Sequence, residues 1–266
     1  MICRYYNISE SNKDTVIKGV LENKTLLLKK ASEYEKDETE FKNFKVYVNL
    51  NDKKGLEKNF NLNQLYIDDS NKISFEEYFK QLSFKKEKEK ELKDVIYKIV
   101  NECIGTVCFS TRTDNDYLWN NYAGKDGFCV VYNDELRNIF KSVFKEANLP
   151  NLFKKVKYSN KELIYNFSSL KHISNFALEI PFRKKTFNSN TNENYRREEE
   201  LRLAVLTKNP ETGERLFEDD DGKDKIKLVE VIGSHPIKYV ITNKDGKYSN
   251  EIEACCKKED IKLKWN

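Results

Sequence analysis

The alternation of hydrophobic and polar positions predicts a chain of short strands interrupted by amphipathic helices. Compact or alternating apolar runs predict strands at residues 2–6, 25–30, 46–50, 106–111, 128–132, 156–158, 225–233, 237–242, 247–256 and 262–265. Apolar residues at helical spacing predict helices at 16–21, 74–103, 133–144 and 161–180. Polar runs predict loops or turns at 31–41, 186–194, 209–215 and 217–224.

These strands follow one another mostly through hairpin-type turns, which favours antiparallel pairing. We therefore expect an α+β fold, with a mostly antiparallel sheet core and about four peripheral helices. A chain of 266 residues is long enough to bury a sizeable core, and neither an internal repeat nor a linker divides it. Residues 1–266 are expected to form a single domain.

Charge, histidine and cysteine usage narrow the classes of function. Charged residues make up 35% of the chain but the net charge is only +4, so only local clusters such as Lys154–Lys155 and Arg183–Lys185 hint at an anionic partner. The chain has two histidines, which are few for a zinc site or a serine-type catalytic triad. Six cysteines without a CxxC pair, and no apolar run of signal or membrane length, predict a soluble cytoplasmic protein with reduced thiols and no membrane partner.

The segment YRREEELRLAV, residues 195–205, holds the strongest candidate chemistry. In an extended strand Glu198, Glu200 and Arg202 lie two apart and share one face, opposite the apolar residues that alternate with them. Two carboxylates on one face form a candidate acid/base or nucleophile-positioning pair. The alternative is a solvated strand face on which neighbouring arginines neutralise both glutamates.

Three motifs resemble an uncharacterised bacterial and phage domain family of unknown function. They are CFST at 108–111, YLWNNYAGKDGFCVVY at 117–132 and YRREEELR at 195–202. That family shows a phenylalanine-serine strand end, a tryptophan and a tyrosine-alanine pair before a glycine, and a later Glu-x-Glu-x-Arg strand. This chain departs from the pattern in three places: EYEKDETE replaces an Asn-Asp-Pro loop, the histidine near Gly127 is absent, and Tyr195 replaces a tryptophan.

The order of these elements also resembles the ADP-ribosyltransferase superfamily. Its members use an arginine or histidine on the first strand, a Ser-Thr strand end and a late Glu-x-Glu. The matching positions here are Arg4, Ser110 with Thr111, and Glu198 with Glu200. The resemblance implies an ADP-ribosyltransferase-like sheet core and NAD as the cofactor consumed, with no glycine-rich dinucleotide loop.

The resemblance also implies a role for each residue. Cleavage of the nicotinamide–ribose bond passes through an oxocarbenium-like centre, which Glu200 would stabilise while Glu198 positions or deprotonates the acceptor. Arg4 would pair with the pyrophosphate. The hydroxyls of Ser110 or Thr111 would hold the ribose or brace Glu200. Trp119 and Tyr122 would stack on nicotinamide or adenine, or else serve as core aromatics.

The resemblance therefore implies an NAD-dependent ADP-ribosyltransferase, a bacterial toxin or anti-phage defence effector, that modifies a protein or nucleic-acid acceptor. An antitoxin or phage protein would be its partner. Two alternatives stay open. One is a metal-dependent nuclease or hydrolase in which Glu198, Glu200 and an acidic residue such as Glu38 hold Mg²⁺. The other is a non-catalytic binding module, in which both glutamates would be surface charges.

Overall fold

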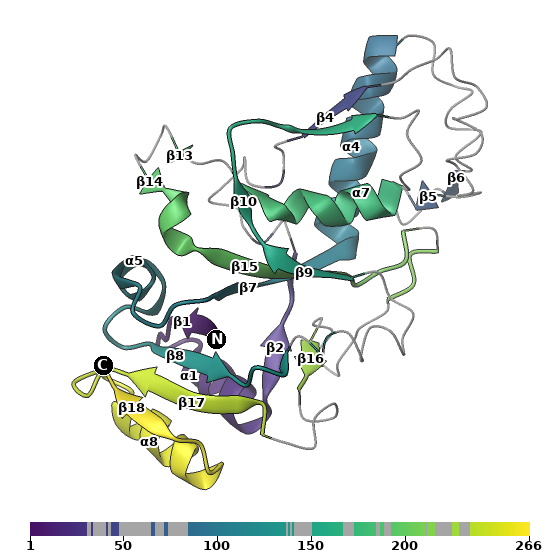
Figure 1. Cartoon of the computed structure of the whole chain (residues 1–266). Helices are drawn as coiled ribbons and strands as arrows, with labels where there is room; N and C mark the ends of the chain where they lie inside the picture. Colours follow the sequence, from purple (N-terminus) through teal and green to yellow (C-terminus); the bar gives the residue numbers. More distant parts are fainter. Residues whose placement is uncertain are drawn as a thin grey trace.

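We describe a computed structural model of the chain. The residues it describes are 1–30, 33, 41, 44–47, 65–66, 72–73, 85–136, 138, 140, 151–166, 173–184, 187–188, 193–210, 212–215, 225–228 and 235–266. Figure 1 shows how a central sheet runs through these residues, with helices above and below it.

The main sheet has eight strands, ordered β18-β17-β8-β1-β7-β15-β9, with β3 pairing beside β7. Only β17 and β18 pair in parallel, and the other pairs are antiparallel. The strands are β1 (Ile2–Tyr6), β3 (Lys29–Lys30), β7 (Ile104–Ser110), β8 (Phe128–Tyr132), β9 (Asn151–Lys155), β15 (Glu200–Leu206), β17 (Ile237–Thr242) and β18 (Leu263–Trp265).

The described residues also form five two-stranded sheets besides the main one. Two of them are parallel: β4 (Phe44–Tyr47) with β11 (Leu163–Asn166), and β10 (Lys157–Tyr158) with β12 (Arg183–Lys184). The other three are antiparallel: β2 (Thr25–Leu27) with β16 (Lys225–Lys227), β5 (Leu65–Tyr66) with β6 (Lys72–Ile73), and β13 (Phe187–Asn188) with β14 (Glu193–Asn194).

Five α-helical segments accompany the sheets in the described part of the chain, several continued by a turn of another helix type. They are α1 (Lys13–Ile17) with the π-turn η1 (Lys18–Glu22), α4 (Lys85–Cys103), α5 (Asp116–Leu118) with the π-turn η3 (Trp119–Ala123), α7 (Ile173–Glu179) with the 3-10 turn η4 (Ile180–Phe182), and α8 (Ser249–Lys258). A further 3-10 turn, η5 (Tyr195–Glu198), leads into β15. None of the described helices is long and apolar enough to cross a membrane.

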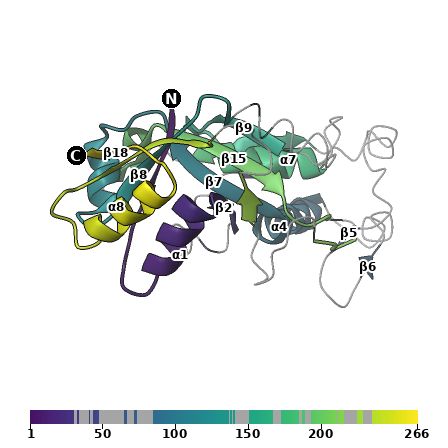
Figure 2. The same ribbon diagram turned by 90° about the horizontal axis from the view of Figure 1, so that it is seen from below.

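One face of the main sheet carries the larger apolar cluster. Leu201, Leu203 and Val205 of β15 are two residues apart, so they all point to this face, where they belong to one apolar cluster with side chains of α1, η1 and α8. Figure 2 shows α1 and α8 lying together on that side of the sheet. The prediction that Leu201, Leu203 and Val205 share one face of a strand is confirmed.

The opposite face carries two smaller apolar clusters with a polar row between them. One cluster joins Cys3, Cys129 and Val131 to Trp119 and Ala123 of η3. The other packs α4 and α7 against the end of β15. The polar row consists of Ser110, Glu200 and Arg202, which the antiparallel register places on the same face as Cys3. Buried charges therefore lie where two helical layers meet over the sheet.

The expected α+β class with a mostly antiparallel sheet is confirmed. Strands at 2–6, 128–132 and 237–242 form as predicted, and so does the helix that ends at Cys103. Of the helix expected over 74–103, residues 74–84 lie outside the described residues. Most of the loop expected at 31–41 and all of the turn expected at 217–224 also lie outside them.

Two predicted elements are of the wrong type. The helix expected over 161–180 begins instead with strand β11, in which buried Tyr165 follows Ile164, a side chain that is 61% exposed. The strand expected over 247–256 is helix α8, because Tyr248, Ile252 and Cys256 recur every four residues and share one buried face. Within the loop expected at 186–194, the described residues form the hairpin β13–β14.

Candidate functional site

Glu198 lies at the centre of the candidate site. It ends the 3-10 turn η5 rather than belonging to a strand as the sequence predicted, and its residue is only 3% exposed. The Nζ atom of Lys184 lies 3.2 Å from its Oε1 atom and 3.0 Å from its Oε2 atom. The hydroxyl of Tyr122 donates to Oε1 at 2.7 Å. A buried carboxylate thus receives groups from β12 on one side and from η3 on the other.

Glu200 begins β15 and is bound differently. Both of its carboxylate oxygens accept from the guanidinium of Arg202, at 2.6 Å from Nε and 2.9 Å from Nη2. The third nitrogen of that guanidinium donates to the carbonyl of Pro181 at 2.7 Å. Such a bidentate pair fixes geometry as well as charge. Glu200 and Arg202 are both buried, so the solvated-face interpretation of these residues is wrong.

Arg202 links the two glutamates into one assembly. Pro181, which accepts its third hydrogen bond, lies in the turn η4 that delivers the chain into β12 and Lys184. The backbone N–H of Glu200 donates to the hydroxyl of Tyr158, and Tyr158 is the register partner of Lys184 in the β10–β12 pair. The contacts of Arg202 and Glu200 therefore hold the strand that carries Lys184 in its place beside Glu198.

Burial controls the electrostatics of Glu198. Loss of solvation raises its pKa to about 7, the charge of Lys184 acts in the opposite direction, and the charge of Glu200 raises it further. Burial and the nearby Glu198 charge raise the pKa of Tyr122 well above its ordinary value, so its hydroxyl stays a donor. A carboxyl with a pKa near neutrality has the protonation behaviour of a general acid or base.

The segment between Glu198 and Glu200 has an unusual backbone. Glu199 has a φ of 47°, in the left-handed region that non-glycine residues rarely occupy. Its exposed side chain forms an ion pair with Arg112 at 3.1 Å, which also pairs with Asp114 at 3.0 Å. This turn allows the carboxylates of Glu198 and Glu200 both to enter the interior while Glu199 stays in solvent.

Ser110 and Thr111 lie at the end of β7, as predicted. Ser110 is the register partner of Glu200, and its hydroxyl accepts the backbone N–H of Arg112 at 3.2 Å. Ser110 is buried and Thr111 is half-buried. The structure thus brings the Ser-Thr strand end beside the Glu-x-Glu segment, two motifs that lie almost ninety residues apart in the sequence.

The two candidate aromatic residues of η3 have different environments. Trp119 is buried, meets Tyr5 edge-on, and donates its indole N–H to the carbonyl of Thr113 at 2.9 Å. Tyr122 is 43% exposed as a residue, while its hydroxyl reaches Glu198. Trp119 is therefore a core aromatic that anchors the turn, and Tyr122 is the residue of the pair that faces both solvent and the site.

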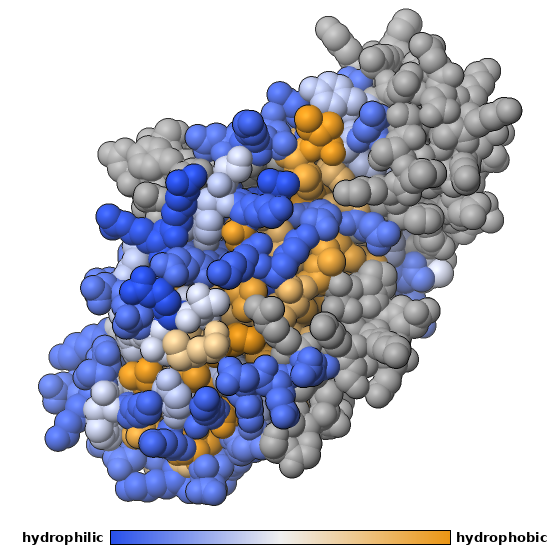
Figure 3. Space-filling view, viewed as in Figure 1, coloured by the Kyte–Doolittle hydropathy of each residue, from blue (hydrophilic) through white to orange (hydrophobic). Residues whose placement is uncertain are grey.

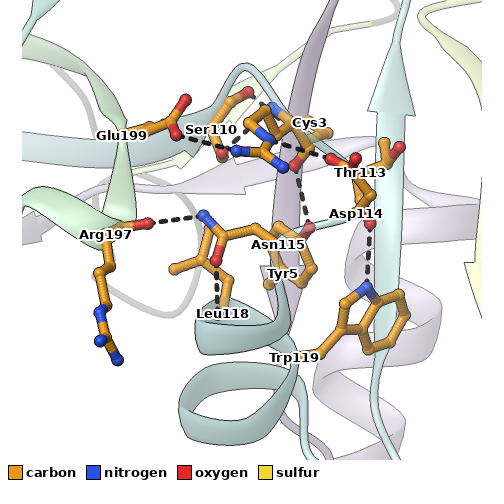
Figure 4. A network of polar contacts seen from close by, with 11 residues as sticks. Cys3, Tyr5, Ser110, Thr113, Asp114, Asn115, Leu118, Trp119, Arg197 and Glu199 are labelled. Atoms are coloured by element: carbon orange, nitrogen blue, oxygen red, sulfur yellow. Dashed lines mark hydrogen bonds and ion pairs between the residues drawn. The ribbon is translucent and has the colours of Figure 1, made fainter.

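A network around Asn115 fixes the position of η3 (Figure 4). The Asn115 amide donates to the carbonyl of Arg197 at 2.6 Å, and its side-chain oxygen accepts the backbone N–H of Leu118 at 3.2 Å. Figure 4 also shows Trp119 directed toward Thr113 on the other side of Asn115. This single amide thus joins the turn that carries Tyr122 to the turn that carries Glu198.

Arg4 does not join this site. Its neighbours in the strand, Cys3 and Tyr5, point to the face that carries Ser110, so Arg4 points to the opposite face. There its guanidinium carbon lies 5.1 Å from the centre of the Tyr6 ring. An extended strand cannot place both Cys3 and Arg4 on one face, and for this reason the structure separates Arg4 from Glu200.

Sequence reasoning missed three residues that shape the site: Lys184, Tyr158 and Arg202 in its bridging role. The sequence predicts Lys184 to be part of a surface basic cluster, yet it is 5% exposed and its ammonium lies 4.3 Å from the centre of the Tyr195 ring. Nothing in the local pattern RKK at 183–185 indicates that its middle residue is buried. Only the pairing of β10 with β12, which is long-range, reveals it.

The site offers little to a metal ion. Glu198 and Glu200 already form ion pairs with Lys184 and Arg202, and no group of three or more His, Cys, Asp or Glu side chains could hold a metal among the described residues. Glu38, the third ligand considered for a nuclease, lies outside the described residues. Carboxylates neutralised by two buried cations are poor ligands for Mg²⁺.

Comparisons of the chain with protein-family models, with curated proteins and with solved structures return no match. A functional assignment therefore depends on the geometry and electrostatics of the site around Glu198.

Proposed function

We propose that this protein is an NAD-dependent ADP-ribosyltransferase with an ADP-ribosyltransferase-like fold, in which Glu198 acts at the reaction centre. The observation that carries this proposal is the state of Glu198. It is a buried carboxyl with a pKa near 7, held between Lys184 and the half-exposed Tyr122, next to the Ser-Thr end of β7. Titratable groups with shifts of this kind concentrate at functional sites.

The chemistry suits a carboxyl that can lose its proton near neutral pH. The glycosidic bond between ribose and nicotinamide breaks, and nicotinamide leaves with the bonding electron pair as a neutral molecule. An oxygen or nitrogen of the acceptor then bonds to the ribose carbon, and its proton passes to Glu198. While ionised, Glu198 also stabilises the positive charge that develops on the ribose.

The roles of the two glutamates in this proposal differ from those expected from the sequence. Cations contact both oxygens of each glutamate, Arg202 those of Glu200 and Lys184 those of Glu198. Within the described part of the chain, however, the carboxylate of Glu200 is joined only to a buried side chain, so in this proposal it acts as a positioning residue. Glu198 is the carboxylate whose surroundings reach the surface, through the exposed ring of Tyr122. We therefore assign the reacting role to Glu198.

Residues of the kinds that bind a nicotinamide dinucleotide surround this carboxylate. The exposed Tyr122 ring offers a flat surface for nicotinamide, and the Thr111 hydroxyl at the end of β7 suits a ribose hydroxyl. The exposed side chain of Arg197 suits a pyrophosphate, the role that the resemblance implies for Arg4, whereas Arg112 already pairs with Glu199 and Asp114.

Nicotinamide release tests the proposal. Purified protein is incubated with NAD⁺ and a cell extract, and release is followed together with label transfer to protein and to nucleic acid. Glu198→Gln should lower release by about 100-fold or more, the usual worth of a general acid or base. Glu259→Gln is the matched control, because Glu259 also forms an ion pair, 2.8 Å from Lys24, on the other side of the molecule.

Three results would contradict this assignment. Release of nicotinamide by Glu198→Gln at the wild-type rate, in protein that circular dichroism shows to be folded, would remove Glu198 from the reaction. Absence of release from wild-type protein with every extract would remove NAD⁺ itself. Activity that survives Glu198→Gln and disappears in Glu200→Gln would return the reacting role to Glu200.

A further inference from the structure

The strands that bring Lys184 to Glu198 present cations on their outer side. Lys155 and Lys157 are exposed and Val156 between them is buried, so the two lysines point the same way. Arg183 is the register partner of Lys157 in the parallel β10–β12 pair and is half-buried. We call Lys155, Lys157 and Arg183 the basic ribbon.

Carboxylates do not neutralise the basic ribbon. Segments 151–166 and 179–184 contain six cations and two carboxylates, a local excess that the near-balanced chain does not share. The carboxylates of Glu162 and Glu179 already pair with Lys45 and Lys154. Within the described part of the chain, none of the three ribbon residues forms an ion pair.

The ribbon lies directly behind the candidate site. Tyr158 follows Lys157 and Lys184 follows Arg183, and these two following residues turn inward, to the backbone N–H of Glu200 and to the carboxylate of Glu198. An anion held by Lys157 and Arg183 is therefore only one residue along each strand from the contacts of the site. Figure 3 shows hydrophilic residues over much of this face of the molecule, including the part where Figure 1 places β10.

We infer that the basic ribbon binds the phosphate backbone of a nucleic acid, and that this nucleic acid is the acceptor of ADP-ribose. The role of the nucleic acid as acceptor rests on the proposed function, whereas its binding to the ribbon does not. Lysine and arginine contacts to phosphates supply most of the affinity of proteins for nucleic acids and position the strand. Because the ribbon lies on the outer side of β10 and β12 and Glu198 on their inner side, the bound strand would pass round the edge of this pair for one of its bases to reach Glu198.

A nucleic acid fits this surface better than an acidic protein does. The apolar residue of the ribbon segment, Val156, is buried, so the ribbon offers charge without an apolar centre. Protein partners bind through a desolvated core of aromatic and aliphatic side chains, whereas a phosphate chain needs only regularly placed cations.

Fluorescence anisotropy with labelled oligonucleotides tests the inference without any need for catalysis. Wild-type protein is titrated with mixed-sequence single-stranded DNA, duplex DNA and single-stranded RNA, between 50 and 200 mM salt. The double variant Lys157→Glu/Arg183→Glu should bind at least about tenfold more weakly. For single strands, its slope of log affinity against log salt should fall by about 1.4, because each lost phosphate contact contributes about 0.7.

The control is Lys244→Glu/Lys262→Glu, which makes the same change in net charge at two exposed lysines near α8. Weakening of both double variants to the same extent would show that net charge, not the ribbon, drives binding, and would overturn the inference. Lack of binding to all three nucleic acids at low salt would also overturn it. So would equally tight, equally salt-dependent binding of poly-glutamate, which would point to an acidic protein.

The inference and the proposed function can fail separately. Oligonucleotide binding that requires the ribbon, without nicotinamide release, would keep the binding surface and remove the transferase. Nicotinamide release that Lys157→Glu/Arg183→Glu leaves unchanged, with label that moves to protein instead of nucleic acid, would keep the transferase and remove the nucleic-acid acceptor.

Discussion

Replacement of Lys184 by methionine tests the electrostatics of the site most directly. The change removes the cation beside Glu198 and keeps most of the side-chain volume. In the wild type, burial raises the pKa of Glu198 to about 7 even though Lys184, 3.0 Å away, acts to lower it. Because an opposite charge at such a distance is worth about one to three pKa units, Lys184→Met should keep Glu198 protonated well above neutral pH.

The effect on stability has a definite sign. A carboxyl whose pKa is raised by folding binds more protons in the folded state. Its contribution to the free energy of unfolding is therefore fully present below its pKa of 4.5 in the unfolded chain, and is lost as pH rises through its pKa in the folded protein. In the wild type that loss is nearly complete just above pH 7. In Lys184→Met it continues at about 1.4 kcal/mol per pH unit, which amounts to about 3 kcal/mol between pH 7 and pH 9.

Urea unfolding at pH 5, 7 and 9, followed by the fluorescence of the buried Trp119, measures this difference. Lys184→Met should lose stability relative to the wild type mainly at pH 9. The control Lys24→Met breaks the pair with Glu259, whose pKa Lys24 lowers, so its deficit should be the same at all three pH values. A deficit of Lys184→Met that is equal at pH 5 and pH 9 would refute the reasoning.

Three further changes have defined outcomes. Tyr122→Phe removes a hydrogen bond that lowers the pKa of Glu198, so the acidic limb of nicotinamide release should move to higher pH; an unchanged profile would separate Tyr122 from the reacting carboxyl. Arg202→Met leaves Glu200 buried without its cation and should cost about 3–5 kcal/mol in urea unfolding, and a loss below 1 kcal/mol would show that the pair is dispensable. Gly127→Ala would place a Cβ atom 2.2 Å from two backbone carbonyl oxygens and should lower stability by about 3 kcal/mol in calorimetry; a normal melting temperature would contradict this packing.

The sequence predicted elements whose periodicity is undisturbed. Strand β8 is fully buried and reads FCVVY, and the helix that ends at Cys103 repeats its apolar residues over several turns. Prediction failed where two periods fit the same residues. The run at 247–256 contains both an alternation around Ile252 and a four-residue repeat, and packing against η1 selects the helix.

The site was predicted in part, because two of its pieces are local in the chain and the others are not. Glu198 and Glu200 could be identified from their spacing, and the Ser-Thr strand end from its context. The cation of Glu200 is Arg202 on the same strand, whereas the cation of Glu198 is Lys184 on a different sheet. Contacts of that kind leave no pattern in the sequence.

The residues from 198 to 202 are costly for stability. Two buried ion pairs each require the desolvation of two charges, and apolar side chains of similar volume often stabilise a core as well or better. Glu199 adds a left-handed backbone between them, at a cost of about 1–2 kcal/mol. All three features lie within five residues, at the junction of two apolar clusters and beside the exposed ring of Tyr122. Selection for a stable core does not explain this concentration of unfavourable contributions, whereas the reactive carboxylate of the proposed function would.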